Sequence, residues 1–410
     1  MKICIISNLY NPYIIGGAEI YVEKIAKYLS KENEVFVITT KPYEGLSSLK
    51  PLLKSRKIYR FYPLNFYHTY NAPKLKIPDF LKLLWHIIDL WNPHSYFMVK
   101  KILEKENPDI VHTHNSSGLS AGAAFSAVKS LNLPLVHTAH DYAILCPYLT
   151  LLCPLWKEEP CKYPRFPCKI YRGMKRKILH SPDIVTAPSQ FVLDMHAKSS
   201  FFEESTKIVL PLGIELKNID FNFDKKKNNG EINVLYVGQV GKHKGVQFLI
   251  NAFKKINTDN IKLHIIGGGH PYEKYLRDLG KDDRRITFYG KIPNEEVQKF
   301  YRKADISVVP SIWYDNSPVV IYEAFKEGTS VIGSNIGGIP ELIKDNYNGF
   351  LFEPGNTEQL KGILDNIIEN PQQLKELSKN AFESVKQYDM NKHIKKLLEI
   401  YKEAIELNKR

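Results

Sequence analysis

The sequence contains no long apolar run, which speaks against a protein that spans a membrane. No stretch reaches the 18 or more apolar residues that a transmembrane helix needs. Residues 1–6 have the pattern of a first β-strand rather than that of a signal peptide. We therefore expect a cytoplasmic protein.

Recognised nucleic-acid-binding motifs are also absent, although the sequence is basic. The formal net charge is +13, and residues 1–222 carry 28 basic and 19 acidic residues against 29 and 25 in the remainder. A basic N-terminal half can meet anionic lipid head groups, a molecule that bears a pyrophosphate, or nucleic acid. Because the lysines are dispersed and form no stripe, we expect no nucleic-acid partner.

Length and composition favour a globular protein of two domains. At 410 residues the chain is too long for one ordinary hydrophobic core. Its 43% apolar and 25% charged residues are typical of a soluble protein. Short apolar runs alternate with helical patterns, as in parallel α/β sheets. We expect strands at residues 2–7, 34–39, 109–113, 134–139, 183–187, 207–210, 233–237, 261–266, 285–289, 305–309 and 329–333.

A hydrophilic segment at residues 220–233 divides these strands into two sets. We expect two doubly wound, Rossmann-like α/β domains, over 1–222 and 223–388, that face each other across a cleft. In such sheets, ligands bind beyond the carboxyl ends of the strands. A final helix over 389–410 carries an apolar stripe formed by Ile394, Leu397, Leu398, Tyr401 and Ile405.

The most informative block lies at residues 304–325. A buried-strand pattern is followed by a loop with Asp315, by the turn signal Asn316-Ser317-Pro318, and by an apolar helix start that carries Glu323. Backbone N–H groups at such a helix N-terminus favour a phosphate, and Glu323 could hold the vicinal hydroxyls of a sugar. A capped helix with one stray acid explains the same spacing, so both interpretations stay open here.

The pattern continues through Gly328, a Val331-Ile332-Gly333 strand, Gly337-Gly338 and Glu341. In this order the chain resembles glycosyltransferase family 4, the retaining, nucleotide-sugar-dependent enzymes of GT-B fold. Their Glu-x7-Glu motif is followed by such a strand and a Gly-Gly-x-x-Glu loop. Asp315 departs from the first Glu of that motif. The resemblance implies a domain at 1–222 that binds the acceptor, a domain at 223–388 that binds the nucleotide-sugar, and a last helix that crosses back onto the first domain.

Two further loops resemble the family. Gly16-Gly17-Ala18-Glu19 matches its Gly-Gly-Ala-Glu loop, although paired glycines are also common in plain turns. Lys244 matches a family lysine, whereas Gln239 stands where the family has arginine, so Lys242 or Lys244 must neutralise more of the diphosphate. The resemblance implies these donor-binding residues: Gly16, Gly17, Gln239, Lys244, Asp315, Asn316, Ser317, Pro318, Val319 and Glu323.

Two neighbouring strands end in histidine, at His112-Thr113-His114 and at His137-Thr138-Ala139-His140. A single histidine is usually structural. Both strand ends, however, resemble family positions that line the sugar and acceptor pocket. We expect His140 to be catalytic, with Asp141 orienting its ring, and we place His114 second.

Four of the five cysteines lie close together in the sequence, at Cys146, Cys153, Cys161 and Cys168, each with a proline beside it. Their spacings differ from those of common zinc fingers. Free thiols, a structural zinc site and disulfides all stay open as interpretations. The segment follows the strand that bears His140, so we expect it to overhang the cleft.

The segment 46–97 mixes basic with aromatic residues, which suits contact with an anionic membrane surface. The alternative is that the aromatic residues form the core of the N-terminal domain. The residues are Lys50, Lys54, Arg56, Lys57, Arg60, Lys74, Lys76 and Lys82, with Tyr59, Phe61, Tyr62, Phe66, Tyr67, Tyr70, Trp85 and Trp91.

The resemblance implies a retaining hexosyltransferase that moves a hexose from a nucleotide-diphosphate sugar to a glycan or lipid-linked acceptor. We expect a role in cell-surface glycan or glycolipid synthesis, at the inner face of the cell membrane. The chain contains no Asp-x-Asp, so we expect no metal cofactor at the donor diphosphate. A non-hydrolysing nucleotide-sugar epimerase and a basic binding protein without enzymatic activity are the alternatives.

Overall fold

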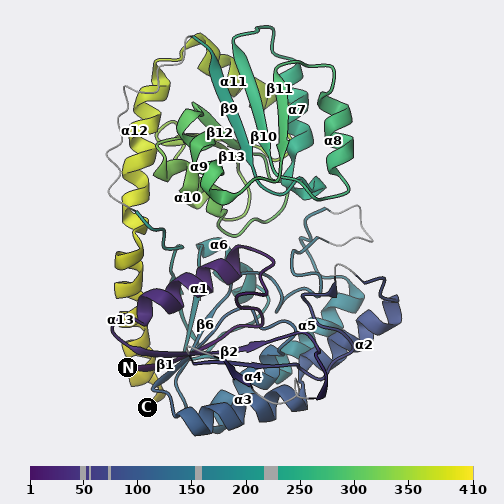
Figure 1. The fold of residues 1–410 in the computed structure, drawn as a ribbon, viewed down its shortest axis with the longest axis vertical. Helices are drawn as coiled ribbons and strands as arrows, with labels where there is room; N and C mark the ends of the chain where they lie inside the picture. The colour runs from purple at the N-terminus through teal and green to yellow at the C-terminus, as the bar shows by residue number, and fades with distance from the viewer. Residues whose placement is uncertain (47–51, 55–56, 73–74, 153–158, 217–229, 410) are drawn as a thin grey trace. The chain divides into compact units, whose positions relative to one another are not determined.

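A computed structural model describes the protein over residues 1–410 apart from 47–51, 55–56, 73–74, 153–158, 217–229 and 410 (Figure 1). The chain forms two compact units. The N-terminal unit comprises Met1–Leu151, Cys161–Gly213 and Asn391–Arg410, and the C-terminal unit comprises Leu152–Pro160 and Ile214–Met390. Most of the expected linker at 220–233 lies outside the described residues.

An eight-stranded sheet forms the centre of the N-terminal unit, in the order β3-β4-β2-β1-β5-β6-β7-β8. Neighbouring strands are parallel, except that β3 pairs antiparallel with β4. The elements of this unit are β1 (Lys2–Ile6), α1 (Gly17–Leu29), β2 (Glu34–Thr40), β3 (Leu52–Lys54), β4 (Ile58–Phe61), α2 (Asp79–Leu90), α3 (Pro93–Glu106), β5 (Ile110–Thr113), α4 (Ala121–Ser130), β6 (Leu135–Thr138), α5 (Phe166–Ile178), β7 (Ile184–Ala187), α6 (Gln190–Ala197), β8 (Thr206–Val209) and α13 (Met390–Asn408).

The C-terminal unit contains a six-stranded sheet, all parallel, in the order β11-β10-β9-β12-β13-β14. Its elements are β9 (Ile232–Val237), η5 (Lys242–Lys244), α7 (Val246–Lys254), β10 (Ile261–Ile266), α8 (Glu273–Gly280), β11 (Ile286–Gly290), α9 (Asn294–Lys303), β12 (Ile306–Val309), α10 (Val319–Lys326), β13 (Ser330–Ser334), η6 (Ile339–Glu341), β14 (Gly349–Phe352), α11 (Thr357–Glu369), α12 (Gln373–Val385) and η7 (Lys386–Tyr388). Each parallel pair needs a crossover connection, which explains the alternation of strands and helices. The expected α/β class is confirmed.

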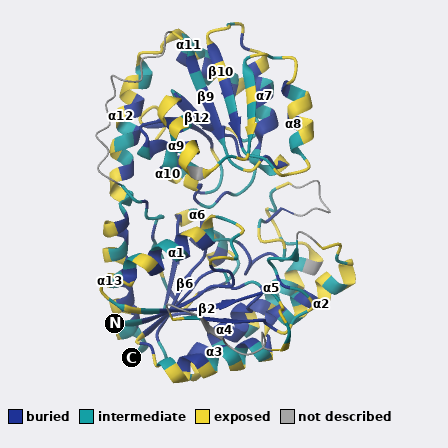
Figure 2. Cartoon of the chain, in the orientation of Figure 1, coloured by how far each residue is buried: buried dark blue, intermediate teal, exposed yellow. Residues whose placement is uncertain are grey.

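Helices cover the faces of both sheets, so most residues of their central strands are buried (Figure 2). Every residue of β5, β6, β7 and β12 is buried. This burial explains why these strands appear in the sequence as short continuous apolar runs rather than alternating ones. Among the described residues, no helix combines the length and the apolarity that a membrane crossing needs.

Helix α13 belongs to the core of the N-terminal unit. Leu397, Tyr401 and Ala404 are fully buried in the same cluster as Ile3 of β1 and Ile110 of β5. The predicted return of the last helix to the first domain is thus confirmed.

Four aromatic residues of segment 46–97 belong to the hydrophobic core and not to the surface. Tyr59, Phe61, Tyr62 and Trp85 are buried, whereas Phe66 is exposed. The prediction that these four aromatic side chains face a membrane is therefore wrong. They lie in or beside strands and helices whose apolar side chains fill the interior of the unit.

Candidate functional site

Glycines bring the loops at the carboxyl ends of the C-terminal sheet into close contact. Gly267 follows β10, and a Cβ added to it would lie 1.7 Å from the carbonyl oxygen of Gly238, which follows β9. Gly245 precedes α7 with a φ of 72°, and a Cβ there would lie 1.8 Å from the carbonyl oxygen of Pro310. A larger residue at 245 or 267 would collide with backbone. The polar side chains of these loops are therefore held over the strand ends.

Lys244 and Asp315, 71 positions apart in the sequence, form an ion pair in these loops. The Lys244 Nζ atom donates to Asp315 Oδ2 at 2.7 Å, and it lies 4.8 Å from the centroid of the Trp313 ring. The same Asp315 oxygen accepts from Trp313 Nε1 at 3.2 Å and from Ser311 Oγ at 3.4 Å. The side chains of Lys244 and Asp315 keep 21% and 11% of their surface exposed, so Lys244 is the more exposed partner of the pair. The structure thus joins two residues that the sequence predicts separately.

The rest of this loop carries little further charge near the pair. Burial, and then the charge of Lys244, lowers the pKa of His243 to about 4, so this ring is neutral at pH 7. Gln239 is exposed, and its backbone carbonyl accepts from Tyr236 OH at 2.5 Å. Lys242 is exposed at the start of η5. Lys244 is therefore the cation that the fold positions best.

The Asn316-Ser317-Pro318 turn leads into α10, as the sequence predicts. Ser317 Oγ hydrogen-bonds the Tyr322 hydroxyl at 2.7 Å, and Val319 begins the helix. A Cβ on Gly337 would lie 2.3 Å from the Asp315 carbonyl oxygen, which also accepts from Gly338 N at 2.8 Å. The Gly-Gly loop after β13 thereby fixes the backbone that carries Asp315.

Glu323 lies in the second turn of α10 and is half-buried. The Tyr301 hydroxyl of α9 donates to Glu323 Oε2 at 3.5 Å. Burial, and then the charge of Glu323, raises the pKa of Tyr301 well above its usual value, so the phenol stays a donor. The same hydroxyl lies 3.4 Å from the Val320 carbonyl oxygen, so α9 contacts α10 at Glu323 and one turn before it.

In the N-terminal unit, the loop after β1 ends at Gly16, where α1 begins. Glu19 is buried, and its Oε2 accepts from Gly16 N at 2.6 Å and from Ile15 N at 3.3 Å. A Cβ on Gly16 would meet only that same oxygen, at an ordinary 3.7 Å. The fold itself therefore does not require glycine at position 16, which leaves a ligand-binding role for Gly16 and Gly17 as a prediction.

The two histidines predicted from the strand ends are in direct contact. His114 Nδ1 and His140 Nε2 are 3.0 Å apart, so one nitrogen must donate and the other accept. Burial, and then the charge of His393, lowers the pKa of His140 to about 3. Burial, and then His112, lowers that of His114 well below 6.5. The pair is neutral at pH 7 and acts as a hydrogen-bonding group rather than a charged one.

Helix α13 completes this histidine cluster, which the sequence does not predict. The His112 ring lies 4.0 Å from that of His114, and its two nitrogens contact Tyr401 OH and Thr138 Oγ1, both at 2.7 Å. The only signal in the sequence was the apolar stripe that contains Tyr401.

A second residue of α13 supports the cluster from its other side. His393 Nδ1 donates to the Pro211 carbonyl at 2.9 Å, so its Nε2 must accept from Tyr21 OH at 2.7 Å. The edge of the Tyr21 ring then packs against His140, with the centroids 5.1 Å apart. Helix α13 therefore contacts the candidate catalytic histidines through two buried chains of hydrogen bonds and ring contacts.

Asp141 interacts with backbone. Its Oδ1 accepts from Ala143 N at 2.8 Å, and burial raises its pKa to about 6. The buried Lys175 of α5 donates to the Ala143 carbonyl at 2.9 Å. A cavity of ≈ 20 Å³ between His114, His140 and Lys175 is too small for a sugar. Orientation of the His140 ring by Asp141 stays a prediction.

Three of the clustered cysteines are described, and none of them forms a disulfide. Burial raises the pKa of the Cys146 thiol to about 11, and the nearby Cys168 and Cys161 raise it further. Within the described ranges, no three His, Cys, Asp or Glu side chains are placed to hold a metal ion. Cys153 lies outside those ranges, so a structural zinc site stays a prediction.

Comparison with known proteins gives matches along nearly the whole chain. Residues 218–384 match the family model described as glycosyl transferases group 1, and residues 15–218 match that described as glycosyltransferase family 4. An uncharacterized glycosyltransferase of Methanocaldococcus jannaschii is 25% identical, over 99% of this chain and 99% of its own.

Two solved structures share the fold. Sucrose-phosphate synthase from Thermosynechococcus elongatus is 21% identical with a TM-score of 0.73, over 98% of each chain. The Anabaena protein HepE, in complex with UDP, is 19% identical with a TM-score of 0.69, over 98% of this chain and 99% of its own. Both likenesses show the two-domain GT-B fold.

The buried neutral histidines predict an N-terminal unit that loses stability in acid. His140 titrates near pH 6.5 in an unfolded chain but near pH 3 in the folded one. Between these pH values His140 binds more protons in the unfolded state than in the folded one. The contribution of His140 to the free energy of unfolding therefore falls as the pH falls. His140→Gln removes the titration, and the slope of the unfolding free energy between about pH 6 and 4 should flatten by about 1 kcal/mol per pH unit.

Urea denaturation at pH 6, 5 and 4 measures that slope. The exposed His180 provides the matched control, His180→Gln, which should leave it unchanged. The same slope in wild type and His140→Gln would contradict the lowered pKa of His140.

Proposed function

Because the chain belongs to glycosyltransferase family 4, we propose that it is a retaining hexosyltransferase. It moves a hexose from a nucleotide-diphosphate sugar to a hydroxyl of a glycan or lipid-linked acceptor, in the synthesis of cell-surface glycan or glycolipid. The observation that carries the proposal is the partly exposed Lys244–Asp315 pair at the carboxyl ends of a parallel sheet. The presence of UDP in the structure of HepE supports a nucleotide-sugar donor.

Lys244 supplies the electrostatic part of catalysis in this proposal. Departure of the sugar leaves additional negative charge on the nucleotide diphosphate, and a positive charge fixed beforehand lowers that barrier. In the free enzyme Asp315 holds Lys244 Nζ in place, and the donor diphosphate then competes with Asp315 for it. The released carboxylate accepts hydrogen bonds from hydroxyls of the sugar. Gln239 adds amide donors without charge.

Residues at the start of α10 bind the remainder of the donor. The backbone N–H groups after Asn316, Ser317 and Pro318 favour a phosphate. Glu323, one turn further along the helix, accepts from the two ribose hydroxyls. With a lysine and a helix N-terminus at the diphosphate, we propose that no metal ion is needed there.

The histidine pair serves the reacting hydroxyl. A retaining transferase must hold the acceptor hydroxyl on the same face of the sugar as the leaving group. A ring with a pKa of about 3 is a weak base at pH 7 but a good neutral hydrogen-bonding group. His140, supported by His114, therefore acts through hydrogen bonds to hydroxyls of the donor sugar or acceptor.

The proposed activity is tested by incubating the purified protein with UDP-, GDP- and ADP-hexoses and measuring release of the nucleoside diphosphate. One donor should be consumed, and EDTA should leave its rate unchanged. Activity that EDTA abolishes and magnesium restores would contradict the metal-free proposal. If no donor is consumed and none binds in calorimetry, the transferase proposal fails.

Glu323→Ala should weaken donor binding at least tenfold. A hydrogen-bonded contact to a charged group contributes about 1.5–3 kcal/mol, and the substitution removes two such acceptors. Isothermal titration with the nucleoside diphosphate measures the loss. Glu369→Ala, which removes an exposed carboxylate at the end of α11, is the control. Equal affinities in the Glu323 and Glu369 variants would place Glu323 outside the site.

Lys244→Met keeps the aliphatic stem and deletes the charge, so kcat should fall by roughly two orders of magnitude. Lys242→Met, at the exposed start of the same turn, should cost much less. Steady-state kinetics of the two variants, measured with the donor that the activity assay identifies, show which lysine contacts the diphosphate. A larger loss in Lys242→Met would move the diphosphate contact to Lys242.

A further inference from the structure

Exposed apolar side chains are concentrated in the N-terminal unit. Of the large apolar side chains that are exposed in the described part of the chain, all but four belong to this unit. Two of its helices, α2 and α5, carry seven of them. A contiguous apolar surface of this kind marks an interaction site more often than single exposed residues do.

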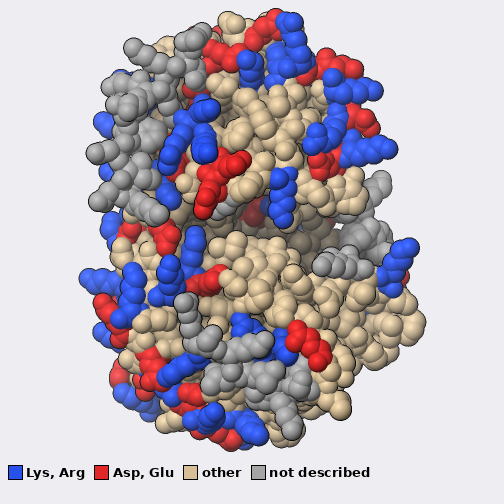
Figure 3. Space-filling model, viewed as in Figure 1, with Lys and Arg blue, Asp and Glu red and all other residues tan. Residues whose placement is uncertain are grey.

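Helix α2 presents an apolar face outward. Phe80, Leu83, Leu84 and Ile87 are exposed, Phe80 at 64%, and their spacing places them on one side of the helix. The opposite side packs inward through Trp85, Asp89 and Leu90. The helix is therefore apolar on its solvent side as well as its core side. Figure 3 shows a broad uncharged surface at the position of α2.

Helix α5 combines an outward apolar stripe with basic residues. Phe166, Ile170 and Met174 recur every four residues and are exposed, Phe166 at 77%. Between residues 161 and 182 the sequence has seven basic residues and no acidic one. Among the basic residues, Arg165, Lys169, Arg176 and Lys177 are exposed. The surface is thus apolar with a cationic border.

The two helices pack against each other. The rings of His86 on α2 and Tyr171 on α5 lie 6.1 Å apart, edge to face. The buried Asp89 of α2 also lies close enough to Lys175 of α5 to raise its pKa. We call the exposed residues Phe80, Leu83, Leu84, Ile87, Phe166, Ile170 and Met174 the α2–α5 face.

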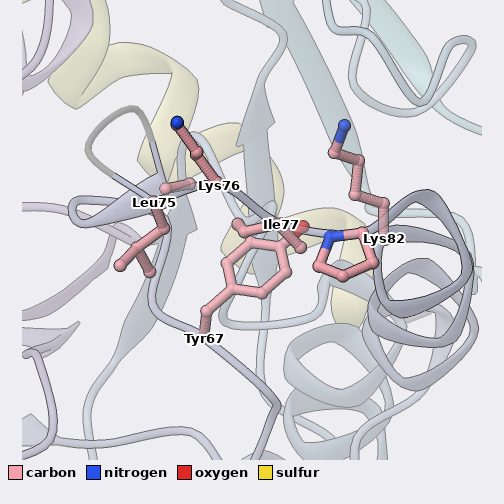
Figure 4. Close-up of a pocket in the computed structure, with 7 residues that line it drawn as sticks. Tyr67, Leu75, Lys76, Ile77 and Lys82 are labelled. Carbon is pink, nitrogen blue, oxygen red and sulfur yellow. The ribbon is translucent and has the colours of Figure 1, made fainter.

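A hollow of ≈ 590 Å³ opens at the start of α2 (Figure 4). Apolar side chains line it, among them Tyr67, Leu75 and Ile77, together with the exposed Lys76 and Lys82. Figure 4 shows both lysines extending toward the same side of the hollow, away from the Tyr67 ring. Their ammonium groups can meet anionic groups above an apolar floor.

We propose that the α2–α5 face docks on an anionic lipid bilayer. Apolar side chains of paired helices enter the interface between head groups and acyl chains, while a cationic border attracts anionic head groups. The charge decides between occupants: an uncharged apolar partner would offer no counter-charge to Lys169, Arg176 and Lys177, whereas an anionic membrane supplies counter-charges across the whole border. The face lies entirely within the N-terminal unit, and the docking does not depend on glycosyl transfer.

The inner side of α5 connects this face to the histidine site. Arg172 Nε donates to the Leu145 carbonyl at 2.7 Å, and Lys175 Nζ donates to that of Ala143 at 2.9 Å. Both carbonyls belong to the segment that follows His140 and Asp141. If the transferase proposal holds, a lipid-linked acceptor in the docked membrane lies beside the helix that holds this segment.

Vesicle flotation of the full-length protein tests the proposal without donor or acceptor. Binding should occur with vesicles that contain phosphatidylglycerol, should be at least tenfold weaker with phosphatidylcholine alone, and should fall at high salt, because each lysine near an anionic surface strengthens binding about fivefold. Phe166→Ser/Ile170→Ser and Lys169→Glu/Lys177→Glu should each weaken binding at least tenfold.

The matched control is Phe97→Ser/Lys101→Glu, which changes one exposed aromatic and one exposed basic residue of α3 in the same unit. It should bind vesicles like the wild type, and all variants should keep the wild-type melting temperature and nucleotide affinity. Equal loss in the control, or no binding to either vesicle, overturns the proposal. The wild type could instead self-associate without binding vesicles, and the α5 variants could abolish that self-association. This result would make the face a contact between copies of the chain. Retained nucleotide binding separates a failure of docking from a failure of the transferase proposal.

Discussion

The buried hydrogen bond between His112 and Tyr401 is the contact on which the N-terminal site depends. It joins β5 to α13 across 289 positions of sequence. With Thr138 on its other nitrogen, His112 has both ring nitrogens occupied, so its orientation is fixed. His114 packs on this ring and meets His140 in turn. An imidazole left without a partner in this interior would cost about 1–3 kcal/mol, so the row of rings keeps its geometry only while α13 is docked.

Both units hold polar groups at the ends of parallel strands, but the interactions that hold these groups differ between the units. In the N-terminal unit the histidines are neutral and bonded to one another or to hydroxyl groups, and most of them are buried. In the C-terminal unit the polar groups are charged and partly exposed, and close approach of glycine backbone holds them in place. This difference suits the two halves of a transfer reaction, because hydroxyl groups are held by neutral hydrogen bonds while a diphosphate requires positive charge.

The sequence predicts the sheets well and the contacts within the site poorly. All eleven expected strands begin within one residue of the observed ones. In β5, β6, β7 and β12, burial on both faces produces the continuous apolar run that predicts the strand. The strands β3, β4 and β14 are missed. Lys244 and Asp315 are found by motif, but their pairing depends on how Gly245, Gly267 and Gly337 fold the loops together. The aromatic residues near α2 are misassigned because composition does not tell which side of an element faces the core.

The order of the elements along the chain has a consequence for how the protein is made. The N-terminal unit needs residues of α13, and α13 follows the whole C-terminal unit in the sequence. During synthesis, therefore, the second unit emerges and can fold while the first still lacks Leu397, Tyr401 and Ala404. A chain interrupted after the C-terminal unit would have a complete C-terminal unit beside an unfinished N-terminal core and histidine row. The position of α13 thus makes the histidine site depend on residues that are synthesised after the whole C-terminal unit.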